Sequence, residues 1–302
     1  MAHTSERHRQ IKRWLIYHRQ AVFVYAFYYL LRFVPVTIAA AFGAFIFRII
    51  GPYMSAHKTA LRNLEMAFPE KSPKEREKIA REVWDNLGRG AGEYMQVDTF
   101  TDKGENPRIL IEGAEHLIAA RDSGERFIIF SAHMANWEVA TIVAALHNVY
   151  LTNVYRHASN PYVDKLIRKI RGKFTGTLIP KGRKGAKQLF IHFKKGAPLG
   201  MLVDQKLNEG IPVPFFGEDC MTATAPAELA LRFDCPIIPT QLIRLPGSRF
   251  KVIINPPMEK PNTGDMKADT LTLLTEINKT MEGWIRENPG QWFWVHKRWP
   301  RQ

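Results

Sequence analysis

Short apolar blocks alternate with amphipathic stretches through most of this chain, and the two patterns separate strands from helices. Blocks rich in β-branched and aromatic residues are typical of buried strands, and we expect them at 108–112, 127–130, 149–155, 177–179, 198–203, 236–245 and 250–254. Apolar residues at helical spacing predict helices at 114–121, 138–146, 161–173, 186–195, 226–233 and 270–287. This alternation predicts an α/β fold with a central, mainly parallel or mixed sheet flanked by helices.

An apolar segment at 21–47 precedes this pattern and is broken by Arg32 and Pro35. Each of its two pieces is shorter than the roughly 20 residues that span a bilayer. A signal peptide is disfavoured because a charge interrupts the segment and no clean polar cleavage region follows. We expect a membrane-associated helix, kinked near Pro35, that either spans the membrane or lies in its interface. An ordinary buried helix is the alternative.

Amphipathic helices are expected across 55–98, joined by a loop at 69–73. The apolar segment and the polar, basic residues before it therefore form one region, 1–52. The remainder, 53–302, forms one domain.

The charge balance is strongly basic, with 43 Lys and Arg against 29 Asp and Glu and a net charge of +14. Such an excess indicates an anionic partner: nucleic acid, a phospholipid surface or an acidic protein. Residues 165–195 hold eleven Lys or Arg and no acidic residue, which favours a surface for anionic lipid head groups or an acidic carrier protein over a merely solvated face. Nucleic acid is disfavoured because no recognised binding module is present.

A histidine and a carboxylate lie between a predicted strand and a predicted helix. His133 falls in the turn after 127–130, and Glu138 begins the helix. Their spacing does not place them on one helical face, but Glu138 on the first turn could reach back to the imidazole. A histidine oriented by a carboxylate is a general-base arrangement. His133, Arg156 and Asp204 also all follow predicted strands, where α/β proteins gather their chemistry.

Several other chemistries lack their motifs. There is no Gly-x-Ser-x-Gly elbow and no His-Glu-x-x-His zinc motif, and the basic glycine-containing stretch at 182–187 lacks the ending of a phosphate-binding Walker loop. Cys220 and Cys235 make neither a disulfide framework nor a metal cluster. With no protein nucleophile and no metal, the histidine is best suited to deprotonating a substrate hydroxyl that attacks an activated acyl group directly.

Four sequence blocks follow one another along the chain. They are His-Met-Ala-Asn-Trp-Glu at 133–138; Val-Tyr-Arg at 154–156 with Asn160-Pro161, Arg168 and Arg171; Val-Asp-Gln-Lys at 203–206 with Val-Pro-Phe-Phe-Gly at 213–217 and a Thr-rich loop; and Cys-Pro-Ile-Ile-Pro at 235–239 with the tail at 294–299. In this order they resemble the bacterial lipid A late acyltransferases, of lauroyl and myristoyl transferase type, within the lysophospholipid acyltransferase superfamily. The resemblance covers nearly the whole chain, although Lys206 and the tail sequence His-Lys-Arg-Trp depart from frequent family forms.

The resemblance implies that His133 is the general base and that Glu138 orients it. The donor would be a fatty acyl thioester on acyl carrier protein, acting as co-substrate without another cofactor or metal. The acceptor would be a hydroxyl of a phosphorylated glycolipid, a lipid A precursor in lipopolysaccharide biosynthesis. The protein would lie at the cell inner membrane with its catalytic domain on the cytoplasmic side. The expected substrate-binding residues are Arg156, Arg171, Asp204, Gln205 and Lys206.

Two alternatives stay open at this point. One is a related acyltransferase acting on another glycolipid, such as a phosphatidylinositol mannoside. The other is a membrane-surface binding protein that keeps the fold without catalysis.

Overall fold

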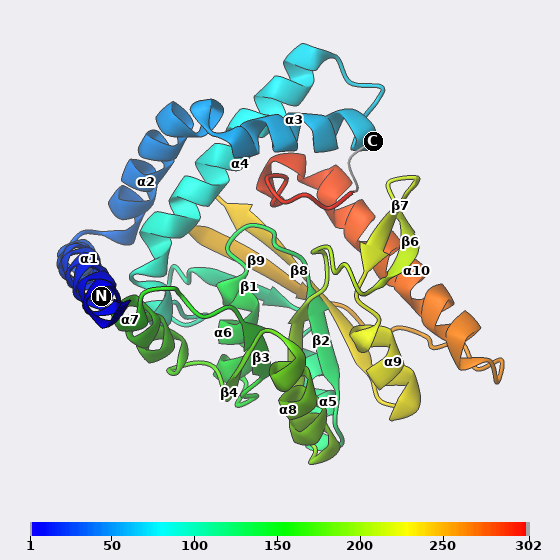
Figure 1. The fold of residues 1–302 in the computed structure, drawn as a ribbon. Helices are drawn as coiled ribbons and strands as arrows, with labels where there is room; N and C mark the ends of the chain where they lie inside the picture. The colour runs from blue at the N-terminus through cyan, green and yellow to red at the C-terminus, as the bar shows by residue number, and fades with distance from the viewer. Residues whose placement is uncertain (1, 300–302) are drawn as a thin grey trace.

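A seven-stranded sheet forms the centre of the protein in a computed structural model, which describes residues 2–299 and the side chains from residue 14 onward (Figure 1). The strand order is β1-β9-β8-β2-β5-β3-β4, and every pair is parallel except the antiparallel pair β8–β9. The predicted mainly parallel or mixed sheet is confirmed. Its strands are β1 (Ile109–Glu112), β2 (Ile128–Ser131), β3 (Thr152–Tyr155), β4 (Thr177–Pro180), β5 (Leu199–Leu202), β8 (Ile237–Leu245) and β9 (Arg249–Ile254).

Helices cover both faces of this sheet. Alternate residues of β2 show the two layers: Ile128 and Phe130 join one hydrophobic cluster, and Ile129 joins the other. The first cluster contains α8, α9 and α10, and the second contains α5, α6 and α7. The helices after the first strand are α5 (Ala114–Asp122), α6 (Glu138–Leu146), α7 (Pro161–Arg171), α8 (Arg183–Lys194), α9 (Ala225–Arg232), α10 (Met266–Glu287) and the short 3-10 turn η3 (Pro289–Gln291).

A small antiparallel hairpin that the sequence pattern did not predict stands beside α10. It consists of β6 (Ile211–Phe215) and β7 (Glu218–Thr222). Prolines at 212 and 214 obscure its strand pattern because they supply no backbone N–H. A two-stranded hairpin leaves one edge of each strand unpaired, so those prolines are tolerated.

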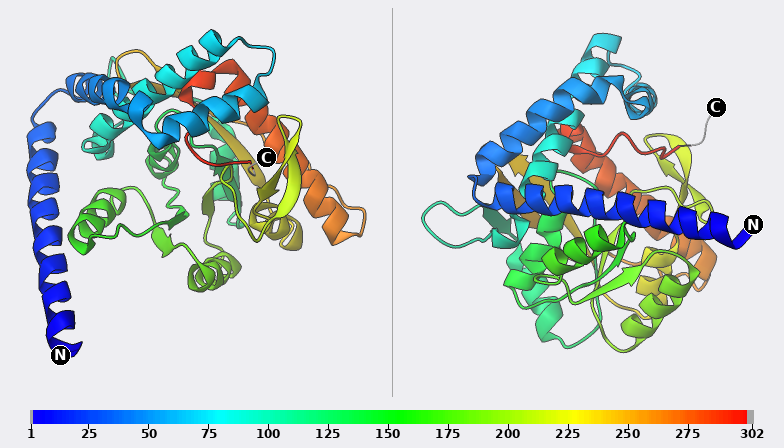
Figure 2. Two further views of the ribbon diagram at one scale, coloured as in Figure 1. Left: turned by 45° about the horizontal axis from the view of Figure 1, so that its top comes forward. Right: turned by 60° about the vertical axis from the view of Figure 1, so that its left-hand side comes forward.

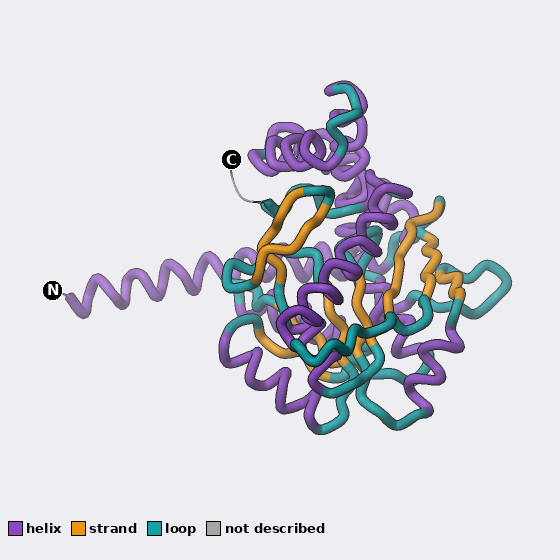
Figure 3. Tube along the Cα trace, turned by 90° about the vertical axis from the view of Figure 1, so that its right-hand side faces the viewer, coloured by secondary structure: helices purple, strands orange, loops and turns teal. Residues whose placement is uncertain are grey.

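The N-terminal third is helical. The helix α1 extends beyond the rest of the molecule (Figures 2 and 3), and α2 turns away from it to lie alongside α4 (Figure 1). The elements are α1 (Ala2–Arg32), α2 (Val36–Ile50), η1 (Gly51–Tyr53), α3 (Ser55–Ala67), α4 (Pro73–Tyr94) and η2 (Val97–Thr99). Helix α1 therefore begins well before the apolar segment, in polar residues where the sequence pattern did not predict a helix.

The break between α1 and α2 confirms the predicted kink at Pro35. Arg32 closes α1 and faces protein: its guanidinium lies 2.8 Å from the Asp98 carboxylate and 3.2 Å from the Met95 carbonyl. The Asp98 side chain is buried and also binds Lys173, beyond the end of α7. This ion-pair cluster ties α1 to η2 and to the end of α7.

Helix α2 is mounted on α4 through glycines. A Cβ at Gly88 would lie 2.3 Å from the Gly43 carbonyl oxygen, and one at Gly92 would lie 2.2 Å from the Ala39 carbonyl oxygen. Only glycine allows the two backbones to approach so closely. Within the described residues, the segment Val36–Tyr53 is long and apolar enough to cross a membrane and is only 28% buried, which speaks against the alternative of an ordinary core helix.

We expect Gly88→Val to lower the free energy of unfolding by at least about 2 kcal/mol, because the added side chain forces α2 off α4. Thermal and denaturant unfolding in detergent measure this. Gly283→Ala on α10 is the matched control, since a Cβ there meets nothing within 4 Å, and it should leave stability unchanged or raise it by up to about 1 kcal/mol. Equal behaviour of the two variants would contradict the close helix contact.

Candidate active site

The turn between β2 and α6, residues 132–137, carries His133 at the carboxyl end of the central strand. Ala135 adopts a φ of 52° within it, and neighbouring elements hold this conformation. The Asn86 side chain on α4 donates to the Ala135 carbonyl at 3.2 Å, and the Ala135 N–H donates to the Gln291 carbonyl at 2.9 Å. Asn136 donates to the buried carboxylate of Glu93 at 3.1 Å. The turn is therefore clamped from α4 and from the C-terminal tail.

His133 is oriented by a buried aspartate. Its Nδ1 lies 2.7 Å from Oδ1 of Asp204, and its backbone N–H donates to Oδ2 at 2.8 Å. The indole N–H of Trp292 donates to the same Oδ2 at 2.7 Å. A carboxylate only accepts, so Nδ1 carries a proton and Nε2 is the basic nitrogen. The Gln205 amide lies 3.2 Å from Nε2.

The surroundings of Asp204 keep it ionised. Burial acts to raise the pKa of Asp204, but the contacts with His133 and Trp292 outweigh burial and lower that pKa to about 2. The charge is thus permanent at neutral pH. A negative group fixed on Nδ1 also stabilises the imidazolium that forms when Nε2 takes up a proton.

Glu138 occupies the predicted position at the start of α6, but it does not make the expected contact with His133. Among the described residues its carboxylate pairs with Arg171 of α7: Oε2 accepts from Nε at 3.0 Å, and Oε1 accepts from Nη2. The expectation that Glu138 reaches the imidazole is therefore wrong. The adjacent strand β5 delivers Asp204 to Nδ1 instead, a pairing across the sheet that local spacing does not reveal.

The Glu138–Arg171 pair is itself shielded from solvent. Burial acts to lower the pKa of Arg171, but the Glu138 carboxylate raises it above its usual value. Burial, reinforced by the Glu138 charge, raises the pKa of the neighbouring Tyr94 phenol. The Arg171 guanidinium stays charged and the Tyr94 phenol stays neutral. This side of the site therefore holds a cation that is fixed in place by Glu138.

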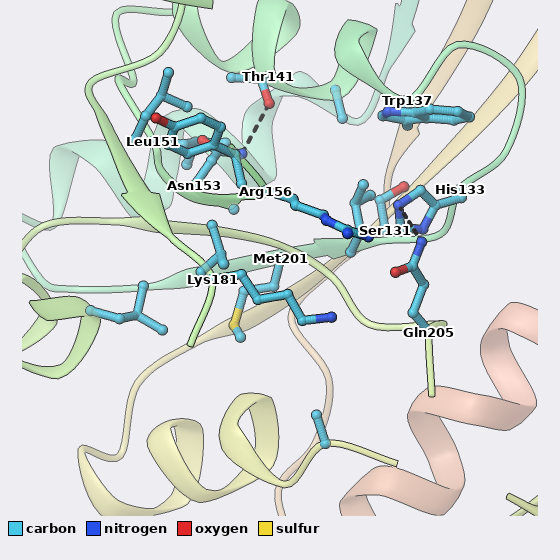
Figure 4. A pocket seen from close by; sticks show the side chains of 18 of the residues that line it. Ser131, His133, Trp137, Thr141, Leu151, Asn153, Arg156, Lys181, Met201 and Gln205 are labelled. Carbon is cyan, nitrogen blue, oxygen red and sulfur yellow. Dashed lines mark hydrogen bonds between the residues drawn. The ribbon is translucent and has the colours of Figure 1, made fainter. Parts of the chain in front are cut away.

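A cavity of about 700 Å³ opens in front of His133. Arg156 and Lys181 extend into it in Figure 4, with His133 and Gln205 on one side and Thr141 and Asn153 on the other. Of the residues expected from sequence, those that line it are His133, Glu138, Arg156, Arg171, Gln205 and Lys206. Asp204 is only 2% exposed and faces His133 and Trp292 rather than the cavity.

The inner part of the cavity is an opening in the sheet itself. β3 and β5 pair only at Thr152–Leu199 and Asn153–Gly200. Beyond these pairs β3 continues beside β4, while β5 continues beside β2. The cavity is lined from both faces of the sheet, by apolar or small residues that include Ile129, Ala140, Leu151, Leu178, Ala186, Leu189, Gly200 and Met201. We call this opening the strand gap.

Residues that sequence reasoning missed complete the site. Trp137 and Phe293 flank the His133 ring with centroids 5.1 and 5.9 Å away. His296 also lines the cavity, and its Nε2 accepts from the Lys206 N–H at 3.0 Å. The tail block contained His296, but nothing in its spacing indicated that the tail returns to the strand ends.

No group of three or more His, Cys, Asp or Glu side chains that could hold a metal ion occurs in the part of the chain that the structure describes. Both cysteines are free and buried, and burial raises the pKa of each thiol. Neither cysteine lines the cavity.

Burial lowers the pKa of His296 more than the nearby Asp204 carboxylate raises it. The unfolded chain binds a proton at this residue below its ordinary pKa of about 6.5, whereas the folded protein resists protonation until lower pH. The stability that His296 contributes is therefore complete above about pH 6.5 and is lost as the pH falls below it. We expect His296→Gln, whose amide oxygen can still accept from Lys206, to flatten the fall in unfolding free energy between about pH 7 and pH 5. Denaturant unfolding across that range tests this, and an unchanged slope would contradict it.

Comparison with known proteins identifies the family of this chain. The family model described as bacterial lipid A biosynthesis acyltransferase matches residues 2–301. The lipid A biosynthesis lauroyltransferase of Escherichia coli is 26% identical over 245 residues, covering 80% of this chain and 78% of the relative. The palmitoleoyltransferase of the same organism is 23% identical, covering 87% and 85%, and its myristoyltransferase is 24% identical, covering 80% and 75%. The chain therefore belongs to the bacterial lipid A biosynthesis acyltransferase family.

Proposed function

We propose that this acyltransferase of lipid A synthesis moves a fatty acyl chain directly from acyl carrier protein to a hydroxyl of a phosphorylated lipid A precursor, with His133 as general base. The observation that carries the proposal is the state of the imidazole. Its Nδ1 is held by the buried Asp204, and its basic Nε2 faces a cavity with a large apolar interior.

The chemistry needs a single proton carrier. Nε2 of His133 takes the proton of the acceptor hydroxyl as the oxygen attacks the thioester carbonyl, and the Asp204 carboxylate stabilises the imidazolium. The tetrahedral intermediate collapses with loss of the thiolate, which receives the proton back from His133. The products are an ester and the carrier thiol, and the enzyme returns to its starting state.

Gln205 and Arg171 support this step in different ways. The Gln205 amide donates to Nε2, so the substrate hydroxyl must displace it. Once displaced, its N–H groups are beside the reacting carbonyl and are suited to the oxyanion. Arg171 offers a cation held by Glu138 at the cavity wall. Glu138 acts through Arg171 in this proposal and is a positioning residue rather than the partner of His133.

The strand gap suits the acyl chain. Its lining comes from both faces of the sheet and is mostly apolar, with Leu151, Leu178 and Leu189 among its residues. Burying an alkyl chain there contributes about 0.8 kcal/mol for each methylene removed from water. Gly200 makes room for two side chains that line the cavity, because a Cβ at this position would lie 2.8 Å from Nδ2 of Asn153 and 2.9 Å from Cδ1 of Leu151.

Positive charges surround the outer part of the cavity, where Arg156, Lys181 and Lys206 all line it. They continue into the basic run at 165–195 on α7 and α8. We assign the cavity cations to the phosphates of the glycolipid and the outer run to the acidic carrier protein or to anionic lipid head groups.

The N-terminal helices supply the membrane contact in this proposal. Helix α1 lies against the basic helix α7: the Asn160 side chain donates to the Tyr17 carbonyl at 2.8 Å, and the Tyr25 hydroxyl to the Tyr162 carbonyl at 3.3 Å. A carrier protein from the cytoplasm requires the site to face that side of the inner membrane. The exposed apolar side chains include Trp14, Leu15, Ile16, Val22, Phe23, Leu30, Phe33, Ile38, Phe42, Phe45 and Ile49.

His133→Ala is expected to reduce acyl transfer by roughly 10²–10⁴-fold while the protein stays folded, because the general base is lost. Asp204→Asn should also be severe. Since the two residues act as one unit, the double variant should be little worse than His133→Ala alone. Initial rates with acyl carrier protein thioester and lipid A precursor measure this, and intact-protein mass spectrometry should find no acyl-enzyme.

Glu138→Gln provides the matched comparison for the choice of partner. It removes a charge from the Arg171 pair, so combined with His133→Ala it should cause a further loss of activity. Non-additive loss in His133→Ala/Glu138→Gln, with additive loss in His133→Ala/Asp204→Asn, would restore Glu138 as the partner. Near-normal transfer by His133→Ala, or a stoichiometric acyl group on Ser131, would overturn the mechanism.

Gly200→Ala is expected to shift the preferred donor to a shorter acyl chain, because the new methyl group displaces the side chains of Asn153 and Leu151, which line the strand gap. Competition between carrier-protein thioesters of different chain length, read by mass spectrometry of the product, measures the shift. Gly283→Ala should leave the preference unchanged. An unaltered preference in Gly200→Ala would place the chain elsewhere.

A further inference from the structure

Trp292 contacts the active site without lining the cavity. It follows η3 in the C-terminal tail, is 2% exposed, and directs its indole N–H to Oδ2 of Asp204 at 2.7 Å. The other two hydrogen bonds to this carboxylate, at 2.7 and 2.8 Å, come from His133. Trp292 is therefore the one donor on Asp204, among the described residues, that does not belong to the histidine.

The tail fixes the position of this indole. Trp292 forms a bridge with Met134 of the active-site turn. Its ring packs edge-on against Phe215 and Trp294, with centroids 5.8 and 4.6 Å away. A donor placed this rigidly holds Oδ2 still, so Oδ1 remains directed at Nδ1 of His133.

The hydrogen bond also affects the charge on the carboxylate. A donor that withdraws electron density from Oδ2 makes Asp204 a weaker base. A weaker base holds the His133 imidazolium less tightly, because both interactions share the same negative charge. Removing the indole N–H should therefore favour the protonated imidazole.

We propose that Trp292 is a positioning residue that sets the basicity of the His133–Asp204 pair, and through it the pH range in which acyl transfer runs. The inference rests on the proposed function, in which the unprotonated His133 is the active form. The acidic limb of the rate profile then reports the loss of that form.

Other ionisable groups near this pair must stay constant in the test. His296 and Arg298 act on Asp204 from the tail. The cavity adds Glu138 and Arg171 from α6 and α7, and Arg156, Lys181 and Lys206 from the loops after the strands. None of these is altered by a change at Trp292 that keeps an aromatic ring.

Trp292→Phe tests the proposal, with Trp294→Phe as the matched control. Trp294 belongs to the same aromatic cluster and is fully buried, but its indole N–H donates to the Pro289 carbonyl at 2.7 Å. We expect the acidic limb of kcat/KM to move to higher pH in Trp292→Phe. At a fixed pH on that limb, kcat/KM should fall by up to about tenfold for every pH unit that the limb moves. The limb of Trp294→Phe should stay at the wild-type position.

The same comparison can be made without turnover. Titration of the His133 imidazole followed by NMR, in detergent-solubilised full-length protein, should show a higher midpoint in Trp292→Phe than in wild type and Trp294→Phe. If carrier-protein transfer proves absent, this arm still tests Trp292. A midpoint equal to wild type, or shifted equally in Trp294→Phe, would overturn the proposal. Trp292→Leu, which is apolar and offers no hydrogen-bond donor, replaces Trp292→Phe if the latter fails to fold.

Discussion

A single buried negative charge organises the site. An ionised carboxylate removed from water is unfavourable unless donors surround it. For Asp204 those donors come from the turn after β2 and from the C-terminal tail. The register of β2 on β5, the turn and the tail must therefore all be correct before this charge is satisfied. The carboxylate that orients His133 is also the group that obliges distant parts of the chain to meet.

The fold and the position of His133 followed from local patterns, whereas its partner did not. Strand-length apolar blocks and helically spaced apolar residues predict strands and helices, because the side-chain repeat of each element is a property of its backbone. His133 and Asp204 were both recognised after strands, but strand order was needed to show that β2 and β5 are neighbours. Glu138 is only five residues from His133 and was the expected partner from sequence, but its carboxylate forms an ion pair with Arg171. The hairpin β6–β7 was not predicted because its prolines mask the strand period. The place of the tail was not predicted because its contacts with Asp204 and the active-site turn are long-range.

The strand gap opens a parallel sheet without breaking its continuity. β3 keeps β4 as a partner and β5 keeps β2 beyond the point where the two strands part. Each strand therefore retains a hydrogen-bonded edge, and the opening leaves only the facing edges unpaired. The cost of interrupting the sheet is limited to a few backbone groups at the end nearest the active site.

Helix α4 contacts both α2 and the active-site turn. One face carries the glycines against which α2 lies, and the same helix carries Asn86 and Glu93, whose side chains bind the active-site turn. This helix has 22 residues and is about 33 Å long, and it connects the two contacts through one continuous element. The position of His133 is therefore coupled through α4 to the place where α2 packs.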